Sequence, residues 1–122
     1  MSKEITYHGR LVFDDGATRI SFDKGVKSVS STGLQPIQHV QNIATSYELV
    51  DLGDLTTPGF VMFHNRDVTN YVEIGVVVSA TFYPLIKLLA GEVAGPFRLG
   101  TTAPYAQANT AACNLEYLLI EA

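Results

Sequence analysis

The chain has 122 residues, enough for one domain with a hydrophobic core, and charged residues make up only 16% of it. Its formal net charge is −4 and no basic patch is visible, which argues against binding to nucleic acid through the phosphates. The single cysteine, Cys113, excludes an internal disulfide, and the apolar stretch from 74 to 86 is too short to span a bilayer. So few charges on a small domain favour a surface that other subunits partly cover.

The first predicted element is a β-hairpin. Apolar side chains alternate along residues 5–13 and again along 18–22, and a period of two indicates strands. The Asp-Asp-Gly sequence at 14–16 lies between them, and glycine supplies the positive φ that a tight turn needs. We expect Asp-Lys-Gly at 23–25 to end the second strand, and residues 28–33 to form a loop or a weak edge strand.

The rest of the chain is predicted to form short strands separated by turns. The strand over 71–78 is almost continuously apolar, which predicts burial of both its faces. Pro84 indicates that the next strand lies at a sheet edge or carries a bulge, because proline has no backbone N–H to donate. The last strand, over 114–120, also fits a short helix that would be marginal alone. The strands predicted after the hairpin cover 37–43, 46–52, 60–64, 71–78, 81–89, 96–99 and 114–120.

These elements predict an all-β fold. No segment carries a sustained helical stripe of apolar residues. Many short strands separated by turns of Gly, Pro and Asp are typical of a sandwich or a barrel. We therefore predict one antiparallel domain over residues 1–122, a jelly-roll-like β-sandwich or barrel.

No group of residues has the spacing of a catalytic or metal site. His8, His39 and His64 are not spaced as metal ligands and are best explained as exposed or hydrogen-bonded strand residues. Cys113 follows small apolar residues, which is typical of a buried, inert thiol. The paired aspartates are explained as turn residues, and neither a nucleophile elbow nor a phosphate-binding loop is found. We expect no catalytic residue, no cofactor and no metal.

The segment 64–70 is the richest in polar side chains. One interpretation is a loop in which Asn65, Arg66, Asp67 and Asn70 contact a partner. The other is a structural connection, stabilised by bonds from its Asn and Asp side chains to the backbone and by pairing of Arg66 with a carboxylate. The structural interpretation is favoured because Asn and Asp suit such turns for local reasons, and both can hold.

Four patterns stand out in the last two-thirds of the chain. They are a strand ending in Asn-x-Asp (65–67), Thr-Asn-Tyr-Val-Glu-x-Gly (69–75), Lys-Leu-x-x-Gly-Glu (87–92) and Leu-Glu-Tyr-Leu (115–118). With the sequence around them, at 57–75, 85–93, 97–99, 105–110 and 115–120, they resemble small virion structural proteins of tailed bacteriophages.

The resemblance implies a non-enzymatic virion protein assembled in the host cytoplasm. Our first hypothesis is a capsid decoration, or cement, protein that binds and stabilises the shell of the major capsid protein. It would form a homo-oligomer, for which a trimer is one arrangement, and its basic N-terminal third would reach an acidic neighbour. The alternative is a tail or fibre component that binds a host surface or glycan through Asn65, Arg66 and Asn70. A small hydrolase or isomerase ranks last, because no acid, base or nucleophile set is found. We expect neither nucleic acid nor a membrane as a partner.

Overall fold

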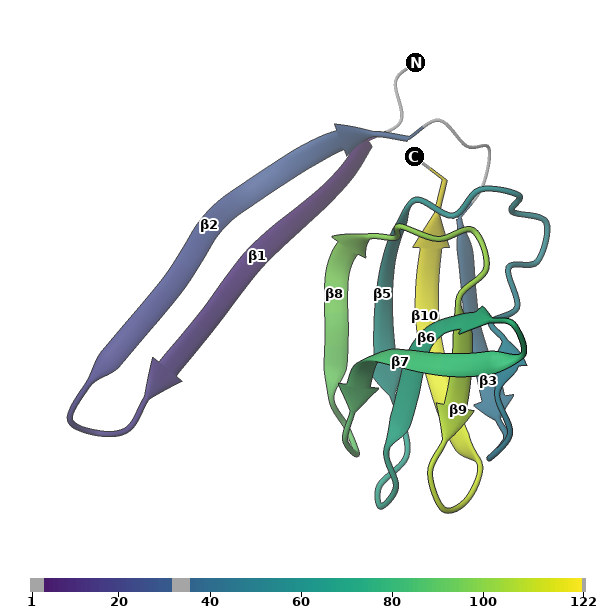
Figure 1. The fold of residues 1–122 in the computed structure, drawn as a ribbon. Coiled ribbons are helices and arrows are strands. Elements are labelled where there is room, and N and C mark those ends of the chain that lie inside the picture. The colour runs from purple at the N-terminus through teal and green to yellow at the C-terminus, as the bar shows by residue number, and fades with distance from the viewer. Residues whose placement is uncertain (1–3, 32–35, 122) are drawn as a thin grey trace. The chain divides into compact units, whose positions relative to one another are not determined.

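The computed structural model describes residues 4–31 and 36–121. Its described residues form β-strands and loops, as predicted, and every strand pairing among them is antiparallel. They contain no helix long and apolar enough to cross a membrane. The chain divides into two compact units, Met1–Thr32 and Gly33–Ala122, which we call the hairpin unit and the sandwich unit (Figure 1). A compact unit need not fold on its own, so this division does not test the prediction of a single domain over residues 1–122.

The hairpin unit is a two-stranded sheet, which confirms the predicted β-hairpin. Strand β1 (Glu4–Asp14) pairs with strand β2 (Arg19–Ser30). In the turn, Asp15 Oδ1 accepts hydrogen bonds from the backbone N–H groups of Thr18 at 2.6 Å and Ala17 at 2.9 Å. These bonds favour the ionised form and lower the pKa of the Asp15 carboxyl.

Strand β2 runs past Gly25, where we expected it to end. His8 pairs with Val26 whereas Arg10 pairs with Asp23, so β2 holds one residue more than β1 over this stretch. Gly25 has a φ of +72° there, which suits a β-bulge. Because the bulge absorbs the extra residue, the pairs Leu11–Phe22 and Ile5–Val29 share one face of the hairpin, whereas Val26, which pairs with His8, lies on the other.

The sandwich unit consists of two four-stranded antiparallel sheets (Figure 1). The strand order is β3-β10-β5-β8 in the first sheet and β4-β9-β6-β7 in the second. Each sheet keeps two edge strands, so the alternative prediction of a closed barrel is wrong and the arrangement is sandwich-like. The strands are β3 (Ile37–Ile43), β4 (Glu48–Leu49), β5 (Phe60–Asn65), β6 (Val72–Val78), β7 (Thr81–Leu88), β8 (Val93–Arg98), β9 (Tyr105–Ala108) and β10 (Cys113–Ile120).

One hydrophobic core is shared by the two sheets. Leu115, Tyr117 and Leu119 of β10 are at most 1% exposed, whereas the alternate residue Leu118 is 38% exposed. The predicted alternation along 114–120 is therefore confirmed, and the short-helix alternative is wrong. The other buried core residues on strands are Ile43, Val61, Phe63 and Cys113 in the first sheet, and Val72, Ile74, Leu88, Ala106 and Ala108 in the second.

Pro84 lies both at a sheet edge and beside a bulge, as predicted. Strand β7 is the edge strand of the second sheet, and its register with β6 shifts between Ile74 and Gly75. Gly75 pairs with Pro84, and the two backbones approach so closely that a Cβ on Gly75 would lie 2.9 Å from the Cα of Pro84. The same Cβ would overlap the backbone oxygen of Tyr83. Only glycine fits this position.

Three details of the second sheet differ from the predictions. Strand β4 is only two residues long, instead of 46–52. Strand β9 is an addition; its buried residues, Ala106 and Ala108, have weak β propensity and give little sequence signal. Strand β6 is not buried on both faces, since Val78 is 56% exposed. The core covers only one face of this sheet, so the apolar run of β6 does not indicate a sheet that is buried between two other layers.

Candidate functional site

The polar segment after β5 is built around a buried amide. Asn65, the last residue of β5, is fully buried. Its Nδ2 donates to the backbone oxygens of Asn70 and Leu88, both at 3.0 Å, and lies 3.2 Å from that of Leu89. Its Oδ1 accepts a bond from the N–H of Asp67 at 3.0 Å. The Asn65 side chain therefore ties this loop to the end of β7, as the structural interpretation predicts.

Asp67 organises the same loop from inside it. Its Oδ2 accepts hydrogen bonds from the backbone N–H groups of Asn70 at 2.6 Å and Thr69 at 3.0 Å. Both bonds favour the ionised carboxylate, so they lower the pKa of Asp67 from its ordinary value of 3.8. The Asp67 carboxylate thus stabilises the turn, and these two bonds account for its position without a bound ion.

Replacing Asp67 by alanine is expected to destabilise the protein at neutral pH and to matter less in acid. The Asp67 pKa is lower in the folded chain than in the unfolded chain, so its contribution is complete above about 3.8. That contribution is lost as the pH falls through the lowered folded pKa. Urea unfolding of both proteins at pH 7 and at roughly pH 2 measures this change. A stability difference of equal size at both pH values would contradict the assignment.

Arg66 is the exposed side chain of the predicted contact set. Its backbone N–H donates to Asn114 O at 2.9 Å, and no ion pair of its guanidinium is found within the described ranges. The neighbouring Val68 is 91% exposed, whereas Asp67 and Asn70 are half-buried and bonded within the loop. Contact between this loop and a partner stays a prediction, and Arg66 is the residue best placed to make it.

The histidines and the cysteine lie apart and have local partners. His8 Nε2 lies 2.7 Å from Asp23 Oδ1 in the hairpin unit, a bond that lowers the pKa of Asp23. His39 meets the Tyr117 ring edge-on, at 5.9 Å between ring centres. Cys113 is buried, and this burial raises the pKa of its thiol and makes it a poor nucleophile. In residues 4–31 and 36–121 no three His, Cys, Asp or Glu side chains are grouped to hold a metal ion.

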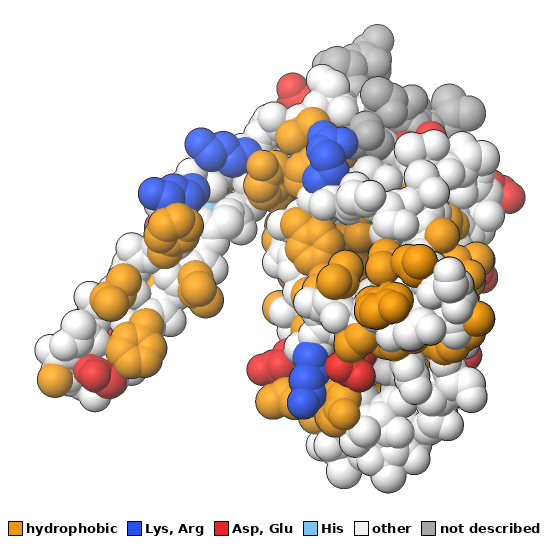
Figure 2. All heavy atoms as spheres, in the orientation of Figure 1, with side chains coloured by type: hydrophobic (Ala, Val, Ile, Leu, Met, Phe, Trp, Pro, Cys, Tyr) orange, Lys and Arg blue, Asp and Glu red, His pale blue; other side chains and the backbone are white. Residues whose placement is uncertain are grey.

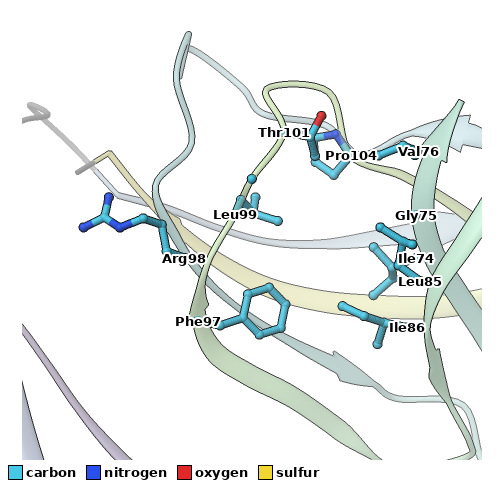
Figure 3. A pocket seen from close by; sticks show the side chains of 11 residues that line it. Ile74, Gly75, Val76, Leu85, Ile86, Phe97, Arg98, Leu99, Thr101 and Pro104 are labelled. Atoms are coloured by element: carbon cyan, nitrogen blue, oxygen red, sulfur yellow. The ribbon is translucent and has the colours of Figure 1, made fainter. Parts of the chain in front are cut away.

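A hollow of about 270 Å³ opens beside β6, β7 and the end of β8 (Figure 3). Apolar side chains line it, among them Leu85, Ile86 and Phe97. Its lining contains no carboxylate, histidine or cysteine among the described residues, and the guanidinium of Arg98 lies 4.9 Å from the centre of the Phe60 ring. The hollow suits an apolar side chain or an apolar ligand.

A second apolar surface covers the outward face of the first sheet. Strand alternation points His64 and Glu116 to this face, where His64 Nδ1 lies 3.1 Å from Glu116 Oε1. A hollow of about 260 Å³ forms beside them. We call the four exposed apolar residues of this face the outer patch: Val40, Met62, Val93 and Leu118, between 38% and 53% exposed.

The hairpin unit carries a third apolar surface, which we call the hairpin face. It consists of two directly opposed pairs, Leu11 with Phe22 and Phe13 with Ile20. These four side chains are between 57% and 74% exposed, and Figure 2 shows hydrophobic side chains along the visible face of the hairpin. The alternation in the sequence identifies which residues share this face, but nothing in it shows that no second layer covers them.

Comparisons of the chain with protein-family models, with curated proteins and with solved structures give no significant match. The described residues include a polar loop and three exposed apolar surfaces, one on the hairpin unit and two on the sandwich unit.

Proposed function

We propose that this chain is a structural protein of a tailed-bacteriophage virion, a capsid decoration or cement protein that binds and stabilises the major capsid protein shell. The observation that carries the proposal is the hairpin face. A two-stranded sheet has no second layer of its own, so four large apolar side chains remain open on it. An exposed apolar patch of this kind marks a surface that another subunit of an assembly covers.

The strand order supports a jelly-roll topology for the sandwich unit. Strand β3 pairs with β10, β4 with β9, β5 with β8 and β6 with β7. The first strand of the unit therefore pairs with the last, the second with the second-last, and so on to the central pair. A chain wound in this way between two four-stranded sheets is the pattern of a jelly roll, which occurs in viral capsid and lectin domains. The step from this topology to a capsid role is made by analogy with such domains.

A cement protein acts by mass action. Whatever binds the assembled shell and not its dissociated subunits shifts the equilibrium toward the shell. The resemblance of residues 57–75, 85–93 and 115–120 to small virion proteins agrees with this role. Three separate exposed apolar surfaces agree with a protein that is partly covered in an assembly.

The test separates heads from tails of the phage that encodes the chain and probes each fraction for it. We expect the chain in heads purified free of tails. Heads made without the chain should release their DNA at a lower temperature, and adding the purified chain should restore the wild-type value. Recovery of the chain with tails alone, or unaltered heat stability of heads that lack it, would overturn the cement role.

A tail or fibre role is the second candidate, and an aromatic cluster on the second sheet favours it. The Tyr47 ring stacks on Phe82 at 6.2 Å and meets Tyr105 edge-on at 6.0 Å. Tyr47 is 39% exposed, so its ring offers a surface to a sugar. This role requires the chain in the tail fraction, and binding of host cells by the full chain that Tyr47→Ala abolishes.

A further inference from the structure

The hairpin face is basic as well as apolar. Tyr7 has the same parity in β1 as Leu11 and pairs with Lys27, so strand alternation directs Lys27 to the hairpin face. The Nζ of Lys24 lies 4.4 Å from the centre of the Phe22 ring, on the same side. The acidic residue Asp23 pairs with Arg10 on the opposite side of the hairpin. Whatever covers the hairpin face should therefore be apolar with acidic groups around it.

A second copy of the chain offers such a surface. Residues 33–122 contain eight acids and three bases, a formal charge of −5, whereas residues 1–32 carry +1. The outer patch surrounds the Glu116 carboxylate, which lies 3.1 Å from His64 Nδ1, and among the described residues no Lys or Arg lines the hollow beside it. Arg98 lies on the same face of the sheet, over the Phe60 ring. Met62 lies directly opposite Leu118 in the sheet, so the patch is continuous across neighbouring strands.

The other apolar surfaces fit the hairpin face less well. Beside the hollow of Figure 3, Lys87 lies two residues from the exposed Leu85 on the same side of β7, whereas the Arg98 side chain points away from the hollow and over the Phe60 ring. Two hairpin faces packed on each other would bring the Lys24 and Lys27 ammonium groups of both copies together. In both cases like charges meet across the contact, which opposes association.

The size of the hairpin face indicates how the copies would be arranged. Four side chains exposed to this degree cover on the order of 400–500 Å², so one docked hairpin buries about 1,000 Å² counted on both partners. That is near the lower limit for a specific interface. If the hairpin face and the outer patch of every copy are both occupied, the buried area per copy doubles. A closed symmetric oligomer satisfies this condition.

We propose that the hairpin face of one copy docks on the outer patch of a second copy, and that Lys24 and Lys27 meet its acidic surroundings. The proposal rests on the proposed function as an assembling subunit and names the surfaces through which the chain assembles with itself. The interface is apolar at its centre and charged at its rim, so added salt should weaken it.

Two variants and a control test this on the full chain by sedimentation at several concentrations. The hairpin variant is Phe13→Ser with Ile20→Ser, and the patch variant is Met62→Lys. The control is Val68→Ser, which changes an apolar residue that is 91% exposed and lies on neither surface. We expect the wild type and the control to form oligomers and each variant alone to be monomeric. Circular dichroism verifies that each variant is folded.

Mixing the two variants is the decisive experiment. The hairpin variant keeps an intact outer patch and the patch variant keeps an intact hairpin, so the mixture should form a one-to-one complex that neither protein forms alone. A monomeric wild type would overturn the proposal, as would a patch variant that still self-associates or a mixture that stays monomeric. The experiment needs no capsid, so its failure leaves the cement role intact, and failure of capsid binding leaves self-association intact.

Discussion

Replacing Asn65 by leucine is expected to lower the free energy of unfolding by about 3 kcal/mol or more. The buried amide donates toward the carbonyl oxygens of Asn70, Leu88 and Leu89, and it accepts from the N–H of Asp67. Leucine is similar in size but supplies none of these bonds. Each buried polar group left without a partner costs about 1–3 kcal/mol. Urea unfolding of both proteins measures the loss.

Asn114→Leu is the matched control for that substitution. The Asn114 side chain accepts a bond from Asn42 Nδ2 at 2.9 Å, but both side chains are exposed and water can replace the bond. We expect this change to stay within about 0.5 kcal/mol of the wild type. Similar losses for Asn65→Leu and Asn114→Leu would show that burial of the amide is not what makes Asn65 important.

Replacing Gly75 by alanine is the second large effect, with an expected loss of about 3 kcal/mol or more. The added methyl group would lie 2.9 Å from the Cα of Pro84 and would overlap the backbone oxygen of Tyr83. Backbone atoms cannot swing aside as a side chain does, so β7 must move away from β6. Leu88 at the far end of β7 belongs to the core, so the movement disturbs core packing.

Gly100→Ala tests whether the added methyl group itself is harmful. A Cβ at Gly100 meets no atom within 4 Å, and the position has no positive φ to strain an alanine. We expect stability within about 0.5 kcal/mol of the wild type. Unfolding midpoints in urea for the two alanine variants give the comparison, and an unaffected Gly75→Ala protein would mean that β6 and β7 are not so closely apposed in solution.

Local signals predicted the parts of the fold that depend on a few neighbouring residues. The turn at 14–16, the alternation along 114–120 and the position of Pro84 each follow from the chemistry of single residues. Glycine after Asp-Lys suits both a strand end and a β-bulge, so the sequence around Gly25 does not distinguish the two. Only the pairing partner, β1, decides between them.

The candidate surfaces depend on residues that are distant in the sequence, and this is why they were harder to predict. Asn65 was recognised as a turn residue, but two of its acceptors, Leu88 and Leu89, come from the end of β7. The outer patch consists of Val40, Met62, Val93 and Leu118 from four strands, whose order no local pattern reveals. For the hairpin face, the alternation predicted its residues but not their exposure, which depends on the absence of a covering layer.

The nested strand order has a consequence for how the chain folds during synthesis. Strand β3 pairs with β10, so the first sheet of the sandwich unit cannot form completely until β10 has left the ribosome. The hairpin pairs only residues that are close in sequence, and hairpins form in about 1–10 μs. A nascent chain can therefore pair its apolar hairpin before the residues that complete the sandwich have been made.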